Sequence, residues 1–317
     1  MLLFVDFSDA PATDSTASHE ALLLPAGPEM LRAFSYGALT VDVTVFEQWY
    51  RMPQPSTAYG FQRGITFPEH QLYFADAVAA ADAAVDFSEF DLVWVMAARE
   101  AAAITFSPAF APTSVFYGVV ADRSVILNGV TFGQDVWLPG WGHNVLVHET
   151  GHLLDLPDLY AYAGTTHRFM GEWDVMGQYA RGPELLAWLR WKLGWIEAGQ
   201  MRCLTEETTE TVTLSPVTRA DGVKFAAVRL DAERYVVVES RRREGYDNAL
   251  PAEGVLVYLV DISIPTGEGP ITLLTDLSTA SLGLLAPGDE AVDPSGRVVI
   301  TFIERSAQGD VVSLTLR

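Results

Sequence analysis

The chain has 317 residues, of which 49% are hydrophobic and 19% are charged, and this composition excludes wholesale disorder. Acidic residues number 41 against 20 basic ones, which gives a net charge of −21. Such a surface repels phosphate backbones and anionic lipid, so we expect no nucleic-acid partner. Cys203 is the single cysteine, which excludes an internal disulfide and a cysteine-rich zinc site.

The first half of the chain combines short strands with helices. Alanine-rich sequence with apolar residues at helical spacing predicts a helix at His70–Val85, and another helix should begin near Asn144. The apolar run Leu92–Ala98 is far shorter than the ~18 residues that cross a bilayer, so we expect no membrane insertion. Strands are predicted at Phe4–Asp6, Leu39–Phe46, Leu92–Met96, Val115–Val120 and Ser124–Leu127.

The second half of the chain has a different character. A helix is predicted at Glu184–Leu193, and after residues 198–204 the pattern becomes one of short strands separated by Gly, Pro and Asp. We therefore expect an α/β arrangement of strands and helices in residues 1–200 and an all-β, sandwich-like domain in residues 201–317, which together make an α+β protein. The strands predicted there are Thr211–Val217, Val223–Leu230, Tyr235–Ser240, Gly254–Asp261, Ile271–Thr275, Val298–Glu304 and Val311–Leu316.

The segment that carries chemistry is His148-Glu149-Thr150-Gly151-His152. On a helix, residues four apart lie one above the other, ~6 Å apart along the axis, so the two imidazoles could share one metal ion. Glu149 lies ~100° around the helix and could reach a water on that ion. Zinc accepts histidine nitrogen and carboxylate oxygen in tetrahedral sites, and is the expected ion.

A third protein ligand is expected at Asp158, six residues after His152. A continued helix would carry Asp158 out of reach, so the helix must stop and turn back. Pro157 disfavours helix at Leu156, and Asp155 is among the few non-glycine residues that tolerate a left-handed conformation. The alternative is that Asp158 is only a residue of the turn at the end of the helix.

Further along the chain, Trp173-Asp174-Val175-Met176 could place a methionine on a tight turn beneath the imidazoles, although such a methionine could also be an ordinary core residue. Together with the histidine motif, Asp158 and Leu193-Gly194-Trp195, this segment resembles the immune-inhibitor-A family of bacterial secreted zinc metalloproteases. Val5-Asp6-Phe7-Ser8-Asp9 and Glu239-Ser240-Arg241 are similar to other parts of that family.

This resemblance implies a metzincin-like catalytic domain that binds one zinc ion and hydrolyses peptide bonds of proteins outside the cell. It implies His148, His152 and Asp158 as ligands, Glu149 as general base and Met176 as the methionine of the turn. Met1–Phe7 is too short and too poor in basic residues for a signal peptide, so the residues leave open a cytoplasmic protein or a signal peptide outside this sequence. Secretion is what the resemblance implies. The sequence carries no signal of the oligomeric state.

Two positions depart from the family pattern. Asp155 stands where the family usually has glycine, and could compete as a ligand. Val85–Asp91 lacks the repeated Asp and Gly of the calcium loop that family members often carry, so we disfavour a calcium site there, while Asp6 and Asp9 could bind calcium elsewhere.

A hydrolase of this kind also needs a donor for the developing oxyanion, and Tyr179, three residues after Met176, is the first candidate, ahead of Tyr160 and His167. No serine-hydrolase elbow, phosphate loop or dinucleotide fingerprint is found. The alternative function is a non-catalytic, zinc-containing binding or adhesion protein that retains a protease-like fold. The intact Glu149 argues against it, because a binder has no need of a general base.

Overall fold

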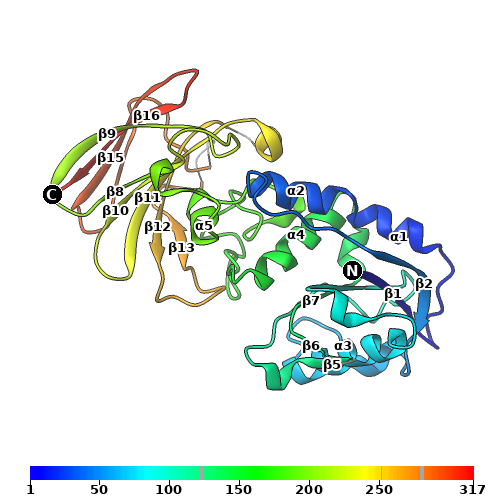
Figure 1. The fold of residues 1–317 in the computed structure, drawn as a ribbon. Helices are drawn as coiled ribbons and strands as arrows, with labels where there is room; N and C mark the ends of the chain where they lie inside the picture. Colours follow the sequence, from blue (N-terminus) through cyan, green and yellow to red (C-terminus); the bar gives the residue numbers. More distant parts are fainter. Residues whose placement is uncertain (122–123, 251, 279–281) are drawn as a thin grey trace. The chain divides into compact units, whose positions relative to one another are not determined.

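The chain divides into two compact units, each built on its own sheets. A computed structural model describes all residues except 122–123, 251 and 279–281 (Figure 1). One unit comprises Met1–Leu31 and Thr40–Asp155, and the other comprises Arg32–Leu39 and Leu156–Arg317. The expected α+β class is confirmed, with 24% of residues in helices and 27% in strands. No helix in the described part of the chain has the length and apolarity needed to cross a bilayer.

The first unit contains a five-stranded sheet in the order β2-β1-β3-β7-β4. Strand β1 is parallel to both β2 and β3, β3 is parallel to β7, and the edge strand β4 runs antiparallel to β7. Strands β1 and β3 are buried at every position, as expected for inner strands of a largely parallel sheet. The strands are β1 (Leu2–Asp6), β2 (Val45–Arg51), β3 (Val93–Ala97), β4 (Ala109–Phe110) and β7 (Gly129–Phe132).

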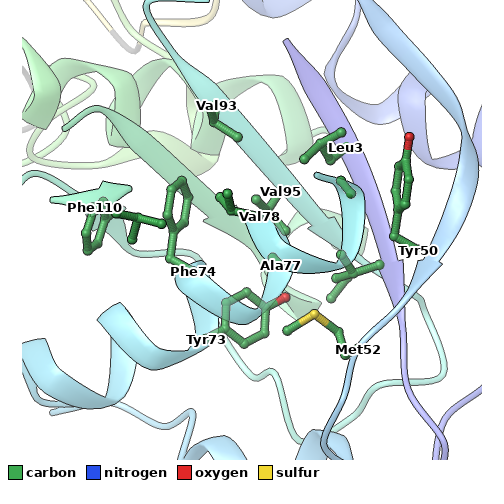
Figure 2. Packing of buried hydrophobic residues seen from close by; sticks show 14 of the residues in the cluster. Leu3, Tyr50, Met52, Tyr73, Phe74, Ala77, Val78, Val93, Val95 and Phe110 are labelled. Atoms are coloured by element: carbon green, nitrogen blue, oxygen red, sulfur yellow. The ribbon is translucent and has the colours of Figure 1, made fainter. Parts of the chain in front are cut away.

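Helix α3 (Phe67–Ala81) packs on this sheet and confirms the helix predicted at residues 70–85. Its start is fixed by a capping box in which Thr66 and Glu69 satisfy each other's backbone N–H groups. Figure 2 shows its buried side chains, among them Tyr73, Phe74 and Val78, facing residues of β1 and β3 across the core of this unit.

The remaining elements of the first unit are short. The two-stranded sheet of β5 (Val119–Ala121) and β6 (Ser124–Ile126) is antiparallel. Helix α1 (Thr16–Leu23) and helix α2 (Ala26–Phe34), whose last three residues are assigned to the second unit, occupy residues for which no element was predicted. The other helices before residue 156 are the 3-10 helices Ser56–Tyr59, Phe87–Glu89, Val115–Tyr117 and Gln134–Trp137, and α4 (Gly142–Leu153).

Two predicted strands of the first half are wrong in part. The strand predicted at Leu39–Phe46 begins only at Val45, because residues up to Leu39 belong to the other unit and sheet pairing starts where the Leu2 N–H donates to the Thr44 carbonyl. The strand predicted at Val115–Val120 begins as a 3-10 turn, because the Ser114 side chain accepts from the Phe116 N–H and stabilises a turn in place of an extended chain.

The second unit contains a five-stranded sheet, β13-β12-β11-β10-β8, and a four-stranded sheet, β14-β15-β16-β9 (Figure 1). Apolar side chains from both sheets form one buried core, in which Val238, Val257, Ile300 and Leu314 lie together. The strands are β8 (Met201–Leu204), β9 (Thr208–Leu214), β10 (Phe225–Arg229), β11 (Arg234–Arg241), β12 (Gly254–Asp261), β13 (Ile271–Leu273), β14 (Glu290–Val292), β15 (Val298–Arg305) and β16 (Asp310–Leu316).

All seven strands predicted in this half are confirmed, and β12 has the predicted bounds. Strands β8 and β14 were not predicted. The helix predicted at Glu184–Leu193 is shorter and forms α5 (Ala187–Lys192), preceded by the 3-10 helix Tyr179–Arg181; two further 3-10 helices are Ala198–Gln200 and Gly245–Ala249. The sheets of this unit begin at Met201, whereas the border between the compact units falls at Asp155.

Candidate metal centre

Helix α4 (Gly142–Leu153) carries the histidine motif and is buried along most of its length, including the apolar residues Val145, Leu146 and Val147. Its first residue allows a close approach to α1, because a Cβ on Gly142 would lie 2.4 Å from the carbonyl oxygen of Leu22. The packing of that first turn helps to set the position of the helix and therefore of the side chains it carries.

The two imidazoles of the motif face each other along α4. The ring centroids of His148 and His152 are 4.8 Å apart and their planes are almost perpendicular, at 89°. His148 and Glu149 are buried and His152 is half-buried. Oε1 of Glu149 lies 4.0 Å from Nε2 of His148. The Glu149 carboxylate is therefore close to the His148 imidazole, although Glu149 does not share the helix face of the two histidines.

The chain turns immediately after α4. The helix ends at Leu153, and Asp155 adopts the left-handed conformation with φ of 61° while its N–H donates to the His152 carbonyl at 3.0 Å. The predicted stop and the predicted left-handed residue are both confirmed. A non-glycine residue in this conformation costs ~1–2 kcal/mol, and aspartate is among the residues that adopt it most readily.

This turn brings Asp158 to the two histidines. One nitrogen from each of His148 and His152 and one carboxylate oxygen of Asp158 lie within 4.8 Å of one another. In the part of the chain that the structure describes, this is the one group of three or more such side chains placed to hold a metal ion. Two imidazole nitrogens and one carboxylate oxygen are donor atoms of the kinds that zinc accepts.

Asp158 is itself held by side chains that the sequence did not single out. The hydroxyl of Tyr162 donates to Oδ2 of Asp158 at 2.6 Å, and the Asp158 N–H donates to Oγ1 of Thr266 at 2.8 Å. Tyr162 could have been found from the sequence, because its hydroxyl lies only four residues after the candidate ligand Asp158. Nothing near Asp158 in the sequence points to Thr266.

Met176 lies on a tight turn organised by Asp174. The Asp174 carboxylate is fully buried and accepts from the N–H groups of Met176 and Leu186, both at 2.6 Å. Burial raises the pKa of Asp174 to about 6, against the lowering effect of these two hydrogen bonds. The Met176 side chain is buried, and its carbonyl accepts from the N–H of Leu159, the residue that follows Asp158, at 3.0 Å.

The segment after Met176 carries the oxyanion candidate Tyr179, which is half-buried at the start of a 3-10 turn. His167 holds this segment with both ring nitrogens. Its Nδ1 donates to the Gly177 carbonyl at 3.0 Å, and its Nε2 accepts from Nε2 of Gln178 at 3.0 Å. The Gln178 side chain then accepts from the Ala180 N–H at 3.1 Å. His167 is thus engaged with the turn, which makes it a weaker oxyanion candidate than Tyr179.

The carboxylates named for calcium are engaged by protein donors. Asp6 accepts from the Arg51 guanidinium at 2.7 and 2.8 Å, and Asp9 accepts from the Ser56 N–H at 2.7 Å. In the segment where the family carries its calcium loop, Asp86 accepts from the Ser88 N–H and hydroxyl.

A buried ionic network supports the turn of Met176 from the β-sheet side of the second unit. Arg241 on β11 is fully buried, binds Asp247 through two hydrogen bonds of 2.6 and 2.7 Å, and donates to the Trp173 carbonyl at 2.7 Å. Glu239, on the same strand, accepts from the Ala187 N–H at 2.8 Å. In the sequence these two strand residues stand out only for their resemblance to a family, since a charged pair on a strand is usually solvated.

No protein-family model matches the chain, and no curated protein matches it. The class of this protein is therefore described from its fold and its site. It is a mixed α+β protein in which a short helix and the turn after it gather two histidines and one aspartate into a group that could hold a metal ion.

Proposed function

We propose that this protein is a zinc-dependent endopeptidase that hydrolyses peptide bonds in protein or peptide substrates. The observation that carries the proposal is the group of His148, His152 and Asp158, whose donor atoms lie within 4.8 Å of one another, with the Glu149 carboxylate beside it. A metzincin-like catalytic domain and export from the cell, both implied by the resemblance of the motifs, belong to the same proposal.

The donor set determines how the site would work. His148, His152 and Asp158 would hold the zinc ion, which would supply a water with its pKa lowered to about 7 and a polarised substrate carbonyl. Glu149 takes the proton of the attacking water as general base and later delivers it to the leaving amine. His148 and His152 are fixed for their role by neighbouring turns of α4, and Asp158 by the turn at Asp155.

Two further residues belong to the proposal. Met176 is assigned as the apolar residue beneath the two imidazoles. Its side chain is buried, and its carbonyl accepts from the N–H of Leu159, which follows Asp158. Tyr179 is assigned to stabilise the developing oxyanion, because its turn is fixed through Gln178 and His167 and a phenol donates well to an oxyanion.

The decisive variant is Glu149→Gln, which removes the base and preserves the size of the side chain. The matched control is Glu89→Gln, an exposed glutamate of the same unit. We expect Glu149→Gln to abolish cleavage of casein while the zinc content stays near that of the wild type, and Glu89→Gln to cleave normally. Unchanged proteolysis in Glu149→Gln would contradict the assigned base. A wild-type protein that binds zinc and cleaves no protein substrate would favour the non-catalytic binding or adhesion protein instead.

A further inference from the structure

The third candidate ligand is held at three of its own atoms. The Asp158 N–H donates to Oγ1 of Thr266 at 2.8 Å, and the Asp158 carbonyl accepts from the N–H of Gly267 at 3.1 Å. Oδ2 of the side chain accepts from the hydroxyl of Tyr162 at 2.6 Å. Asp158 is only 5% exposed, so little water competes for these hydrogen bonds. Two of them fix the Asp158 backbone and the third fixes its carboxylate.

Two of these three contacts come from the connection between β12 and β13, residues 262–270, which we name the β12–β13 loop. The loop is built to approach the Asp158 segment closely. Gly267 has φ of 70°, its carbonyl accepts from the Tyr162 N–H at 3.0 Å, and a Cβ at this position would lie 2.4 Å from the Tyr162 ring. Both the conformation and the space therefore require glycine at this position.

The β12–β13 loop is also fixed at its base. The Asp261 N–H donates to the Pro270 carbonyl at 2.9 Å, and Oδ1 of Asp261 accepts from the Ser263 N–H at 3.0 Å. On the far side, the Leu273 N–H donates to the carbonyl of Phe169 at 3.0 Å. A loop held at both ends can transmit the position of the sheet to Asp158.

Tyr162 contributes mainly through its hydroxyl. Tyr162 is 60% exposed and its ring lies against Gly267, but its hydroxyl is the atom that bonds to the Asp158 carboxylate. The same hydroxyl lies 3.4 Å from Oγ1 of Thr266, so Asp158, Tyr162 and Thr266 form a closed polar group. Partners of this kind orient ligating carboxylates in metal sites, and their removal typically weakens metal binding roughly 10- to 100-fold.

We propose that Tyr162 and the β12–β13 loop, through Thr266 and Gly267, are positioning elements that orient Asp158 for metal binding. The β12–β13 loop would then take part in holding the third ligand. This inference rests on the proposed function, because it takes Asp158 as a ligand, but it makes a separate statement about which residues preorganise that ligand. Tyr162 engages one carboxylate oxygen and thereby favours ligation through the other.

The test measures zinc affinity by competition with a chromophoric chelator, using the full chain. Tyr162→Phe removes only the hydroxyl, and Thr266→Val replaces the hydroxyl by a methyl group at constant shape. Thr266→Ser keeps the hydroxyl and serves as the conservative rescue. The matched controls are Tyr117→Phe, an exposed tyrosine of the first unit, and Thr272→Val on β13. Thermal unfolding of each metal-free variant sets a temperature at which all of them are folded.

We expect Tyr162→Phe and Thr266→Val each to bind zinc roughly 10- to 100-fold more weakly than the wild type, with Thr266→Ser and both controls close to the wild type. Wild-type affinity in both variants, while His148→Gln loses zinc, would overturn the positioning role and leave the proposed site intact. Equal losses in Thr266→Ser or in the controls would also overturn it, since the effect would not depend on these hydroxyls. A wild-type protein that binds no zinc would overturn the positioning role and the proposed function together.

Discussion

Arg241 and Asp247 form a fully buried ion pair in which Nε and one terminal nitrogen of the guanidinium bind the two carboxylate oxygens at 2.6 and 2.7 Å. The same guanidinium donates to the Trp173 carbonyl, three residues before Met176. The turn that carries Met176 therefore depends on a charge carried by a β-strand of the same unit.

Replacing Arg241 with methionine should strongly destabilise the second unit, because Asp247 and Glu239 would be left buried without their cation. Breaking a buried pair in this way costs about 3–5 kcal/mol of unfolding free energy. Urea denaturation followed by tryptophan fluorescence measures it. Arg234→Met, which breaks an exposed pair with Asp231, is the control and should change stability little. An equal change in the free energy of unfolding in the two variants would show that the buried pair stabilises the protein no more than the exposed one.

The stability of the first unit should depend on pH through His70. This side chain is buried among Phe61, Phe74 and Phe110, and burial lowers its pKa from 6.5 to about 3. The unfolded chain then binds a proton that the folded chain does not, so stability is complete above pH 6.5 and is lost as the pH falls towards 3. Within that window the loss attributable to His70 is about 1.4 kcal/mol per pH unit.

Chemical denaturation of the wild type and of His70→Gln across this pH range isolates the contribution of His70. The variant should be less stable at neutral pH and should lose less stability on acidification. Parallel pH profiles for the two proteins would mean that His70 does not titrate differently in the folded and unfolded states.

Gly129 on β7 should not tolerate a side chain. A Cβ there would lie 2.2 Å from Cζ of Phe74, whose ring is buried and stacked on Phe110 at 4.6 Å and so has nowhere to move. Gly129→Ala should cost roughly 1–3 kcal/mol by overpacking the core. Gly199→Ala, where no atom lies within 4 Å of the added Cβ, is the control. Calorimetry should show a lower Tm for the first variant alone, and an unchanged Tm for Gly129→Ala would mean that Phe74 can move aside.

Much of the local architecture could be predicted because its causes are local. The spacing of His148 and His152 places them on one helical face, and Pro157 and the tolerance of Asp155 for a left-handed conformation predict where α4 stops. The unbroken apolar run between Gly254 and Asp261 likewise predicts β12 to the residue.

The parts that could not be predicted depend on distant residues. Thr266 lies more than a hundred positions after Asp158, and no periodicity links the two. Arg241 on β11 reads as a solvated strand residue, because sequence does not reveal that Asp247 and Glu239 accompany it into the interior. Helix α1 was missed because its sequence lacks a clear apolar stripe, and its position depends on packing against α4.

Zinc titration of the purified chain measures whether His148, His152 and Asp158 together hold one divalent ion. His148→Gln, His152→Gln and Asp158→Asn are compared with His143→Gln, which lies on the same helix outside the group. We predict one tight zinc site in the wild type and in His143→Gln, and a loss of tight binding in each of the other three variants. A wild type without a tight site, or an Asp158→Asn variant that binds zinc as tightly as the wild type, would contradict the account.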